Sequence, residues 1–335
     1  MYRYPSESEK HECTWLAFGM SPTIWGKQLL PLVQQNVADV ALSIAQFEPV
    51  RVLVTANNKD VAYQLMGHDV EYIEAPLNDI WVRDYGANFV IDTQQQKLAA
   101  IDFNFNGWGN KQPHQFDRHV ATLMAEFTGA ELVKSSLTME GGGIEVDGRG
   151  NAVLTESCII NHNRNPTQTK QQIEQELKRC LGLNNIIWLE GIKGRDITDG
   201  HVDFYARFLN DNAIIINMDD DPDSFDYHVT RSHFATLQKQ QQVDRSLEDI
   251  ITLNAPQDIR ISRSRYPDFA ASYINYYHCN NGIIIPQFGD KIADNTAIEI
   301  LNDYFPDKKI NAINIDAIAI GGGGIHCITQ QQPVL

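Results

Sequence analysis

The stretch "AIAIGGGGIHCITQQQP" (residues 317–333) sets four consecutive glycines directly before His326 and Cys327. A phosphate-binding loop would carry spaced glycines or a Lys-Ser/Thr pair after them, and this stretch has neither. Glycines also let the backbone bend sharply and lie close to a bound molecule. In an extended segment His326 and Cys327 point to opposite faces, so His326 is a poor base for Cys327. If Cys327 is a nucleophile, the fold must bring a base to it from elsewhere in the chain.

The bulk composition describes an acidic protein with a sizeable core. The chain has 335 residues, 43% of them apolar, and a net charge of −16. The charge disfavours nucleic acid as a partner and favours small cationic ligands. No run approaches the roughly 18 apolar residues of a membrane helix. The polar N-terminus predicts no signal peptide.

Five cysteines are widely spaced, with no CxxC pair: Cys13, Cys158, Cys180, Cys279 and Cys327. This pattern predicts neither a zinc cluster nor a disulfide framework, and it fits reduced thiols in the cytoplasm. The acidic run "DDDPDS" (219–224) lacks the glycine and glutamate of a calcium loop, so it is expected to be a solvated loop. We therefore expect neither a zinc cluster nor a calcium site.

The hydrophobic pattern predicts an α/β protein. Runs rich in β-branched residues predict strands at 14–19, 50–56, 87–92, 98–103, 143–148, 152–157, 185–191, 201–209, 213–217, 282–286 and 310–320. Helical stretches lie between groups of strands, at 25–46, 117–129, 166–183, 245–254 and 295–305. The order strand, strand, helix, strand recurs about five times without a sequence repeat. No Pro/Ser-rich linker divides the chain, which favours a single domain over residues 1–335.

Three polar clusters outside the C-terminal stretch could carry chemistry. They are "WVRDYG" (81–86) with Asp84, "MEGGG" (139–143) with Glu140, and "GHVD" (200–203) with His201 and Asp203. At the start of a strand, His201 and Asp203 would share one face. Taken alone, each cluster is more simply explained as a turn, a bulge or a capped strand edge.

Taken together, a thiol, a histidine and three acids suit attack on a guanidinium carbon. A guanidinium is planar and permanently cationic, and carboxylates grip its nitrogens in bidentate fashion. Here Asp84 and Asp203 would hold it while the Cys327 thiolate attacks its carbon. His201 would act as acid and then as base, oriented by Glu140. The ordinary cysteine pKa of about 8.5 means that a cationic neighbour or substrate must favour the thiolate.

These motifs resemble those of the agmatine deiminase family, which belongs with the bacterial peptidyl-arginine deiminases in the guanidino-group-modifying (pentein) superfamily. The resemblance spans nearly the whole chain, including "HECTWLAF" (11–18), "NDIWVRDYG" (78–86), "MEGGGIEVDG" (139–148), "DITDGHVDFYARF" (196–208) and the glycine-rich stretch. It implies a pentein five-bladed α/β propeller of ββαβ-like units around a pseudo-fivefold axis, with the site in a central channel.

The resemblance also implies roles for individual residues. Asp84 and Asp203 would bind the guanidinium, Glu140 and His201 would form the acid–base pair, and Cys327 would be the nucleophile. Trp81 would line the channel, and the backbone at Gly324 would lie against the substrate. No metal or organic cofactor is implied.

The choice of substrate depends on the group at the end of the substrate away from its guanidinium. The peptidyl-arginine branch uses arginines shortly after the Trp-x-Arg-Asp stretch to hold a carboxylate, and "IDFNFNGWGNKQ" (101–112) contains none. This favours agmatine, whose tail ends in an ammonium group that Asp196 or Asp199 could bind. Family members commonly carry an aromatic residue where Ser8 stands in this chain.

Three alternatives remain open at this stage. The same chemistry could act on arginine, peptidyl-arginine or another small guanidine. The amidino group could pass to an amine acceptor if water is excluded. The chain could also be a non-catalytic pentein that binds ligands or partners. A homo-oligomer, most simply a dimer, is the expected assembly.

Overall fold

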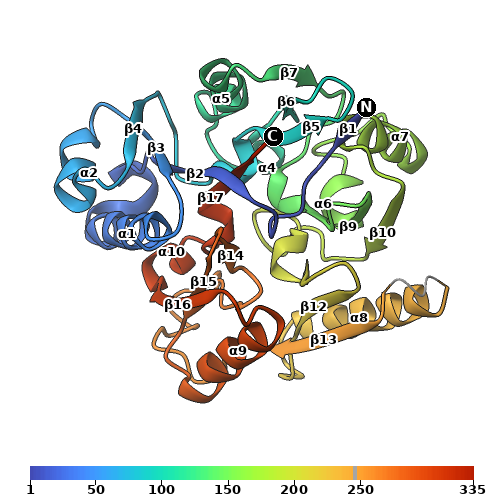
Figure 1. The fold of residues 1–335 in the computed structure, drawn as a ribbon. Helices are drawn as coiled ribbons and strands as arrows, with labels where there is room; N and C mark the ends of the chain where they lie inside the picture. Colours follow the sequence, from blue (N-terminus) through green and yellow to red (C-terminus); the bar gives the residue numbers. More distant parts are fainter. Residues whose placement is uncertain (244–246) are drawn as a thin grey trace.

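The computed structural model describes residues 1–243 and 247–335. Its strands form five small sheets, which Figure 1 shows distributed around the middle of the molecule with helices toward the outside. The strands are β1 (Tyr2–Arg3), β2 (His11–Phe18), β3 (Val50–Val54), β4 (Glu71–Glu74), β5 (Asn88–Asp92), β6 (Lys97–Asp102), β7 (Glu131–Lys134), β8 (Ile144–Val146), β9 (Asn151–Thr155), β10 (Asn185–Leu189), β11 (Ala206–Phe208), β12 (Ala213–Met218), β13 (Asp249–Asn254), β14 (Tyr277–His278), β15 (Gly282–Gln287), β16 (Lys309–Asn314) and β17 (Thr329–Pro333).

The helices vary widely in length. The α-helices are α1 (Pro22–Ala45), α2 (Lys59–Met66), α3 (Val82–Tyr85), α4 (Gly107–Asn110), α5 (Val120–Thr128), α6 (Glu156–Ile159), α7 (Lys170–Leu181), α8 (Asp226–Val243), α9 (Lys291–Tyr304) and α10 (Asp316–Ile320). Short 3-10 helices are η1 (Asp117–His119), η2 (Gly141–Gly143), η3 (Val202–Phe204) and η4 (His326–Ile328).

Every sheet contains the same unit, an antiparallel pair followed by a helix and a parallel strand. In one of them β14 pairs antiparallel with β15, α9 crosses over, and β16 returns parallel to β15. A parallel return needs a crossover of this kind, whereas an antiparallel pair needs only a tight turn. The middle strand carries a continuous buried run, Ile283 to Ile285, because it is covered on both faces.

The fifth sheet joins the two ends of the chain. C-terminal β17 pairs antiparallel with N-terminal β2, which continues through α1 to the parallel strand β3. Figure 1 shows β17 and β2 side by side near the centre. The largest hydrophobic cluster spans this sheet and its neighbours, and it includes Trp15, Phe18 and Ile328.

Local sequence signals explain several helix boundaries. Thr169 and Gln172 form a reciprocal capping box at the start of α7. The side chain of Asp290 accepts a hydrogen bond from the Ala293 N–H and caps α9. Gly182 ends α7 with a left-handed conformation, φ 68°.

The strand-rich α/β prediction is confirmed, but three predicted segments differ from the structure, and helices α2 and α8 were not predicted. Residues 249–254, inside a predicted helix, form strand β13, and residues 245 and 246 of that prediction lie outside the described residues. The predicted strand 201–209 begins only at Ala206, after η3. The run 310–320 divides into β16 and α10, because Asp316 starts a helical turn after the strand.

None of the helices in the described part of the chain combines the length and the apolar character that crossing a membrane requires.

Candidate active site

The predicted site residues occupy equivalent positions in different sheets. Asp84 lies in α3 just before β5, Glu140 immediately precedes η2 and β8, Asp203 lies in η3 before β11, and Cys327 lies in η4 before β17. Each short helical turn therefore leads into the first strand of an antiparallel pair. In the remaining sheet, Asn275 stands just before β14. All five side chains are buried, so the strand entrances of the five sheets converge on one interior site.

These helical turns correct the local geometry expected from the sequence. Asp84 was expected to follow a strand, and His201 and Asp203 to begin one. Instead Asp84 lies in α3, and His201 precedes the 3-10 helix that contains Asp203. Cys327 was expected in an extended segment and lies in η4.

Cys327 lies against an acid and an amide. Its Sγ is 3.6 Å from Asp203 Oδ2 and 3.5 Å from Asn275 Oδ1. Burial raises the pKa of the Cys327 thiol well above its ordinary value, and the carboxylates of Asp203 and Asp84 raise it further. The Gly324 backbone N–H acts in the opposite direction by favouring the thiolate. Burial and these two carboxylates therefore favour the thiol form of the sulfur.

His201 lies between two carboxylates. Its Nε2 is 3.2 Å from Glu140 Oε2, and its Nδ1 is 3.6 Å from Asp84 Oδ1. Burial lowers the pKa of His201, but the neighbouring carboxylate of Asp84, assisted by Glu140, raises it well above its ordinary value. The imidazole is therefore held as the cation, ready to donate a proton. Its Nδ1 has no hydrogen-bond partner among the described residues.

Asp84 presents a carboxylate beside this open nitrogen. Its Oδ2 accepts a hydrogen bond from Trp108 Nε1 at 2.8 Å, and its Oδ1 accepts one from the Gly142 N–H at 3.1 Å. Burial raises the pKa of Asp84 to about 6, with His201 opposing the shift. A Cβ atom at position 142 would lie 2.7 Å from both Asp84 Oδ1 and His201 Nδ1. Only glycine leaves this space open.

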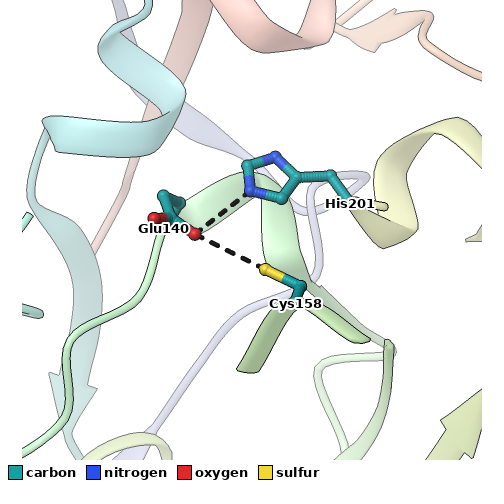
Figure 2. A group of neighbouring side chains, drawn as sticks. All are labelled: Glu140, Cys158 and His201. Atoms are coloured by element: carbon teal, nitrogen blue, oxygen red, sulfur yellow. Dashed lines mark hydrogen bonds and ion pairs between the residues drawn. The ribbon is translucent and has the colours of Figure 1, made fainter. Parts of the chain in front are cut away.

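Figure 2 shows Glu140 as the shared acceptor of His201 and Cys158. The Cys158 Sγ lies 3.5 Å from Glu140 Oε2. Donor atoms of these three residues fall within 4.8 Å of one another and could hold a metal ion. However, Arg164 Nε donates to both oxygens of Glu140, at 2.8 and 2.9 Å, and this buried cation opposes a second one. The hydrogen bonds of Glu140 with His201 and Cys158 account for the short distances within this group.

Asp199 is not placed to bind a substrate ammonium, contrary to the prediction. It is buried, and its Oδ2 accepts from Arg164 Nη1 at 2.7 Å and lies 2.8 Å from Lys111 Nζ. Burial opposes ionisation, but Lys111, Asn163 and Arg164 lower the pKa of Asp199 to about 2. Asp199 thus fixes Arg164, which in turn holds Glu140 against His201.

A second relay reaches Asp203 from the N-terminal segment. His326 Nδ1 lies 2.7 Å from Asp203 Oδ2, and His326 Nε2 lies 2.8 Å from Glu7 Oε2. Both ring nitrogens face carboxylate oxygens, so the ring is engaged on both sides and bridges Asp203 to Glu7. His326 is therefore unavailable as a base for Cys327. Asp203 Oδ1 has no partner among the described residues and remains free to accept hydrogen bonds from a guanidinium.

The glycine run packs against aromatic and amide groups. A Cβ at Gly323 would overlap the Trp81 ring, and one at Gly324 would overlap the Asn275 side chain. Trp81 donates its indole N–H to Asp79 Oδ2 at 3.0 Å and is buried. The glycines are thus required for the close approach of the backbone, and Trp81 lies behind them.

A cavity of about 470 Å³ adjoins the site, and His201 is part of its wall. The lining comes from the segment before η3, the β12–α8 loop, the segment before β14 and the first glycines: Arg195, Asp196, Ile197, Thr198, His201, Phe204, Tyr205, Asn217, Asp219, Ser224, Phe225, Asp226, Ala255, Arg263, Pro267, Asp268, Phe269, Ala270, Ala271, Ser272, Ile320, Gly321 and Gly322. Ser8 instead lines a separate small cavity with Glu145 and Arg207. The serine at this position therefore leaves the larger cavity unaltered.

Sequence reasoning missed several residues of this site. Asn275, Arg164 and Glu7 were not singled out, although each contacts a predicted site residue. Signals existed for Arg164 and Asn275, because "NHNRNP" (161–166) and "YINYY" (273–277) also resemble segments of the family. Glu7 lies in "PSESEKHE" (5–12), where the chain departs from the family pattern at Ser8. None of these local patterns points to the contacts that the three residues make.

The fold and the buried Cys–His–acid site define a guanidino-modifying type of protein, and the comparisons agree. The family model for Porphyromonas-type peptidyl-arginine deiminase matches residues 3–333, and the chain belongs to this family. A Legionella pneumophila relative is 38% identical over 332 residues, covering 98% of this chain and 94% of its own length. The agmatine deiminase of Medicago truncatula is 32% identical, covering 100% and 97%.

Solved structures show the same relationship. The agmatine deiminase of Enterococcus faecalis superimposes with a TM-score of 0.90 at 30% identity, covering 99% of this chain and 96% of that one. A C. jejuni agmatine deiminase with substrate bound, carrying a Cys-to-Ser substitution, gives a TM-score of 0.88 at 28% identity, with the same coverage.

Proposed function

We propose that this chain is an agmatine deiminase, a hydrolase that converts the guanidinium of agmatine to N-carbamoylputrescine and releases ammonia. The observation that carries the proposal is the interior site itself, in which Cys327, His201 and three carboxylates converge. Family membership and the relatives named agmatine deiminase support the same reaction.

Asp84 and Asp203 hold the guanidinium in this mechanism. Asp203 Oδ1 has no hydrogen-bond partner within residues 1–243 and 247–335, and Asp84 Oδ1 faces the open space at Gly142. A cation bound between these acids lies close to the Cys327 sulfur. Its charge lowers the cost of ionising the thiol, whose proton passes to solvent water, so substrate binding and thiolate formation are coupled.

The thiolate then attacks the guanidinium carbon. Protonated His201 donates its proton to one amino group, which leaves as ammonia, and a covalent thiouronium remains on Cys327. The now neutral His201 accepts a proton from water, the resulting hydroxide adds to the same carbon, and the thiolate leaves. Glu140 stabilises the imidazolium at each protonated stage. These steps use side chains alone.

The proposal extends to the fold, the domain, the cellular location and the assembly of the protein. The five ββαβ sheets support a five-bladed pentein propeller with a pseudo-fivefold axis, folded as one catalytic domain over residues 1–335. Five free cysteines support a cytoplasmic setting. A homo-oligomer, most simply a dimer, is the proposed assembly.

The decisive experiment measures ammonia release from agmatine, arginine, a peptide with C-terminal arginine, and methylguanidine. We expect agmatine to be hydrolysed and Cys327→Ser to abolish release while circular dichroism and the melting temperature are retained. Turnover only of another guanidine would reassign the substrate. Full activity in the serine variant would disprove covalent catalysis by Cys327.

A further inference from the structure

The cavity beside His201 has an outer wall that the deimination chemistry leaves unused. Tyr205, Asn217 and Asp226 lie there, on the η3–β11 connection, on β12 and at the start of α8. Because His201 belongs both to the catalytic group and to the cavity wall, the cavity adjoins the catalytic group.

Asn217 carries an unpartnered amide in this wall. The residue is 6% exposed, and its Oδ1 is buried without a hydrogen-bond partner among the described residues. Burying an amide oxygen without a partner costs free energy, so such groups are normally paired with protein, water or ligand. A hydrogen-bond donor bound in the cavity would satisfy it.

Asp226 supplies a carboxylate to the same wall. Its Oδ1 accepts a hydrogen bond from Tyr205 Oη at 2.9 Å, and its Oδ2 forms none with the described residues. Burial raises the pKa of Asp226 to about 6, so its charge is incompletely compensated. An acid at the first residue of α8 also stabilises the helix. Helix stabilisation by Asp226 does not explain why Asn217 Oδ1 has no hydrogen-bond partner among the described residues.

The remaining charges favour a cation. Acids outnumber cations in the lining even when the His201 imidazolium is counted, since four aspartates face two arginines and this histidine: Asp196, Asp219, Asp226, Asp268, Arg195, Arg263 and His201. Arg195 lies over the Phe225 ring at 4.0 Å, and Arg263 donates to the Pro256 carbonyl. Both arginines therefore have protein partners. The aromatic rings in the lining offer an apolar surface for the alkyl chain of a ligand.

We propose that Asn217 and Asp226 form an extended amine subsite, which selects guanidino polyamines whose tails carry a second amino group beyond the length of agmatine. This rests on the proposed deiminase function. A volume of about 470 Å³ lies within the roughly 300–1,000 Å³ of pockets that bury drug-sized ligands. A butylammonium tail is much smaller than such ligands.

The test compares agmatine with its N-(3-aminopropyl) derivative, a triamine-length guanidine. Steady-state kcat/KM is measured for the wild type, Asn217→Leu, Asp226→Asn and a control, Asp223→Asn, which removes an exposed charge in the same loop outside the cavity. We expect the wild type to prefer the longer substrate by about tenfold or more. Each subsite variant should reduce the ratio by about tenfold, the value of one charge-assisted or buried hydrogen bond. The control should retain it.

Two results would overturn the subsite and leave the deiminase function standing: no preference for the longer substrate in the wild type, or a preference that survives in both subsite variants. If no guanidine is hydrolysed, the proposed function fails, and calorimetry then tests the subsite alone. Binding of the longer substrate to the wild type, weakened about tenfold in Asp226→Asn and not in Asp223→Asn, would retain it. Equal binding by all three proteins would refute it.

Discussion

Glu7 anchors the N-terminal segment in the middle of the molecule. Its carboxylate lies 2.9 Å from Arg83 Nη2, 2.7 Å from Arg207 Nη2 and 2.8 Å from His326 Nε2. All of these groups are buried. Replacing Glu7 with the isosteric glutamine removes one negative charge and leaves two buried guanidinium groups, those of Arg83 and Arg207, undercompensated.

The expected cost follows from this environment. Removing one partner of a buried ion pair typically destabilises a protein by about 3–5 kcal/mol. Arg207 keeps Glu145, and Arg83 keeps Gln331, so the effect should stay within that range. With an unfolding entropy of about 2.1 cal/mol/K per residue, the Glu7→Gln variant should melt about 4–7 °C below the wild type.

Glu9 provides the matched control two residues away. Its carboxylate pairs with Arg3 at 2.7 Å, but both side chains are 38% exposed. Exposed pairs contribute about 0–1 kcal/mol, so Glu9→Gln should shift the melting temperature by less than about 2 °C. Calorimetry at pH 7 on both variants measures the difference. Equal shifts would refute the idea that Glu7 holds the centre of the fold together.

The pH dependence has a definite sign. Burial alone would raise the pKa of Glu7, but Arg207, His326 and Arg83 outweigh it and hold the pKa well below its ordinary value. A depressed pKa contributes stability above the unfolded value of about 4.3. The stability gap between wild type and Glu7→Gln should therefore be full at pH 7. It should shrink as the pH falls below about 4.

Three further predictions concern catalysis, and ammonia-release kinetics measure each of them. Glu140→Gln should lower kcat by about a hundredfold because the imidazolium of His201 loses its anion; an unchanged kcat would remove Glu140 from the mechanism. Gly142→Ala should abolish activity because its Cβ would displace Asp84 and His201. The control, Gly129→Ala, lies at a left-handed helix end with open space around it and should cost only about 1 kcal/mol of stability. Comparable activity in the two variants would contradict the steric argument for Gly142. In the wild type, kcat/KM should fall as the pH drops through about 6, because Asp84 becomes protonated and no longer binds a cation; a flat profile from pH 5 to 7 would show that the Asp84 charge is not needed.

The sequence was sufficient to predict the class of fold because buried strands leave a strong local pattern. The isoleucine runs of β12 and β15 are continuous and flanked by turns, so their position needs no tertiary information. The capping box and the C-terminal glycine of helix α7 are sequence signals that predict its two ends. Residues 249–254 were misread because "DIITLN" is too short for its periodicity to separate strand from helix.

The grouping of the proposed site residues was predictable for a different reason. Cys327, His201, Glu140, Asp84 and Asp203 form a set that only a few reactions use together, even though each is ordinary alone. Their supporting contacts were not predictable. Asp199 looked available as a free acid, and only the fold reveals that Arg164 and Lys111 neutralise it. The bridge from Glu7 through His326 to Asp203 joins segments about 300 residues apart, which no local pattern encodes.

The sheet that joins β2 to β17 has a consequence for how the protein is made. Its paired residues, such as Leu16 and Thr329, lie about 310 positions apart, so loop closure across the whole chain precedes this pairing. Cys327 sits at the entrance to the closing strand. During synthesis the acids and His201 emerge from the ribosome well before Cys327. Under the proposed mechanism, the site therefore gains its reactive sulfur only when β17 pairs with β2.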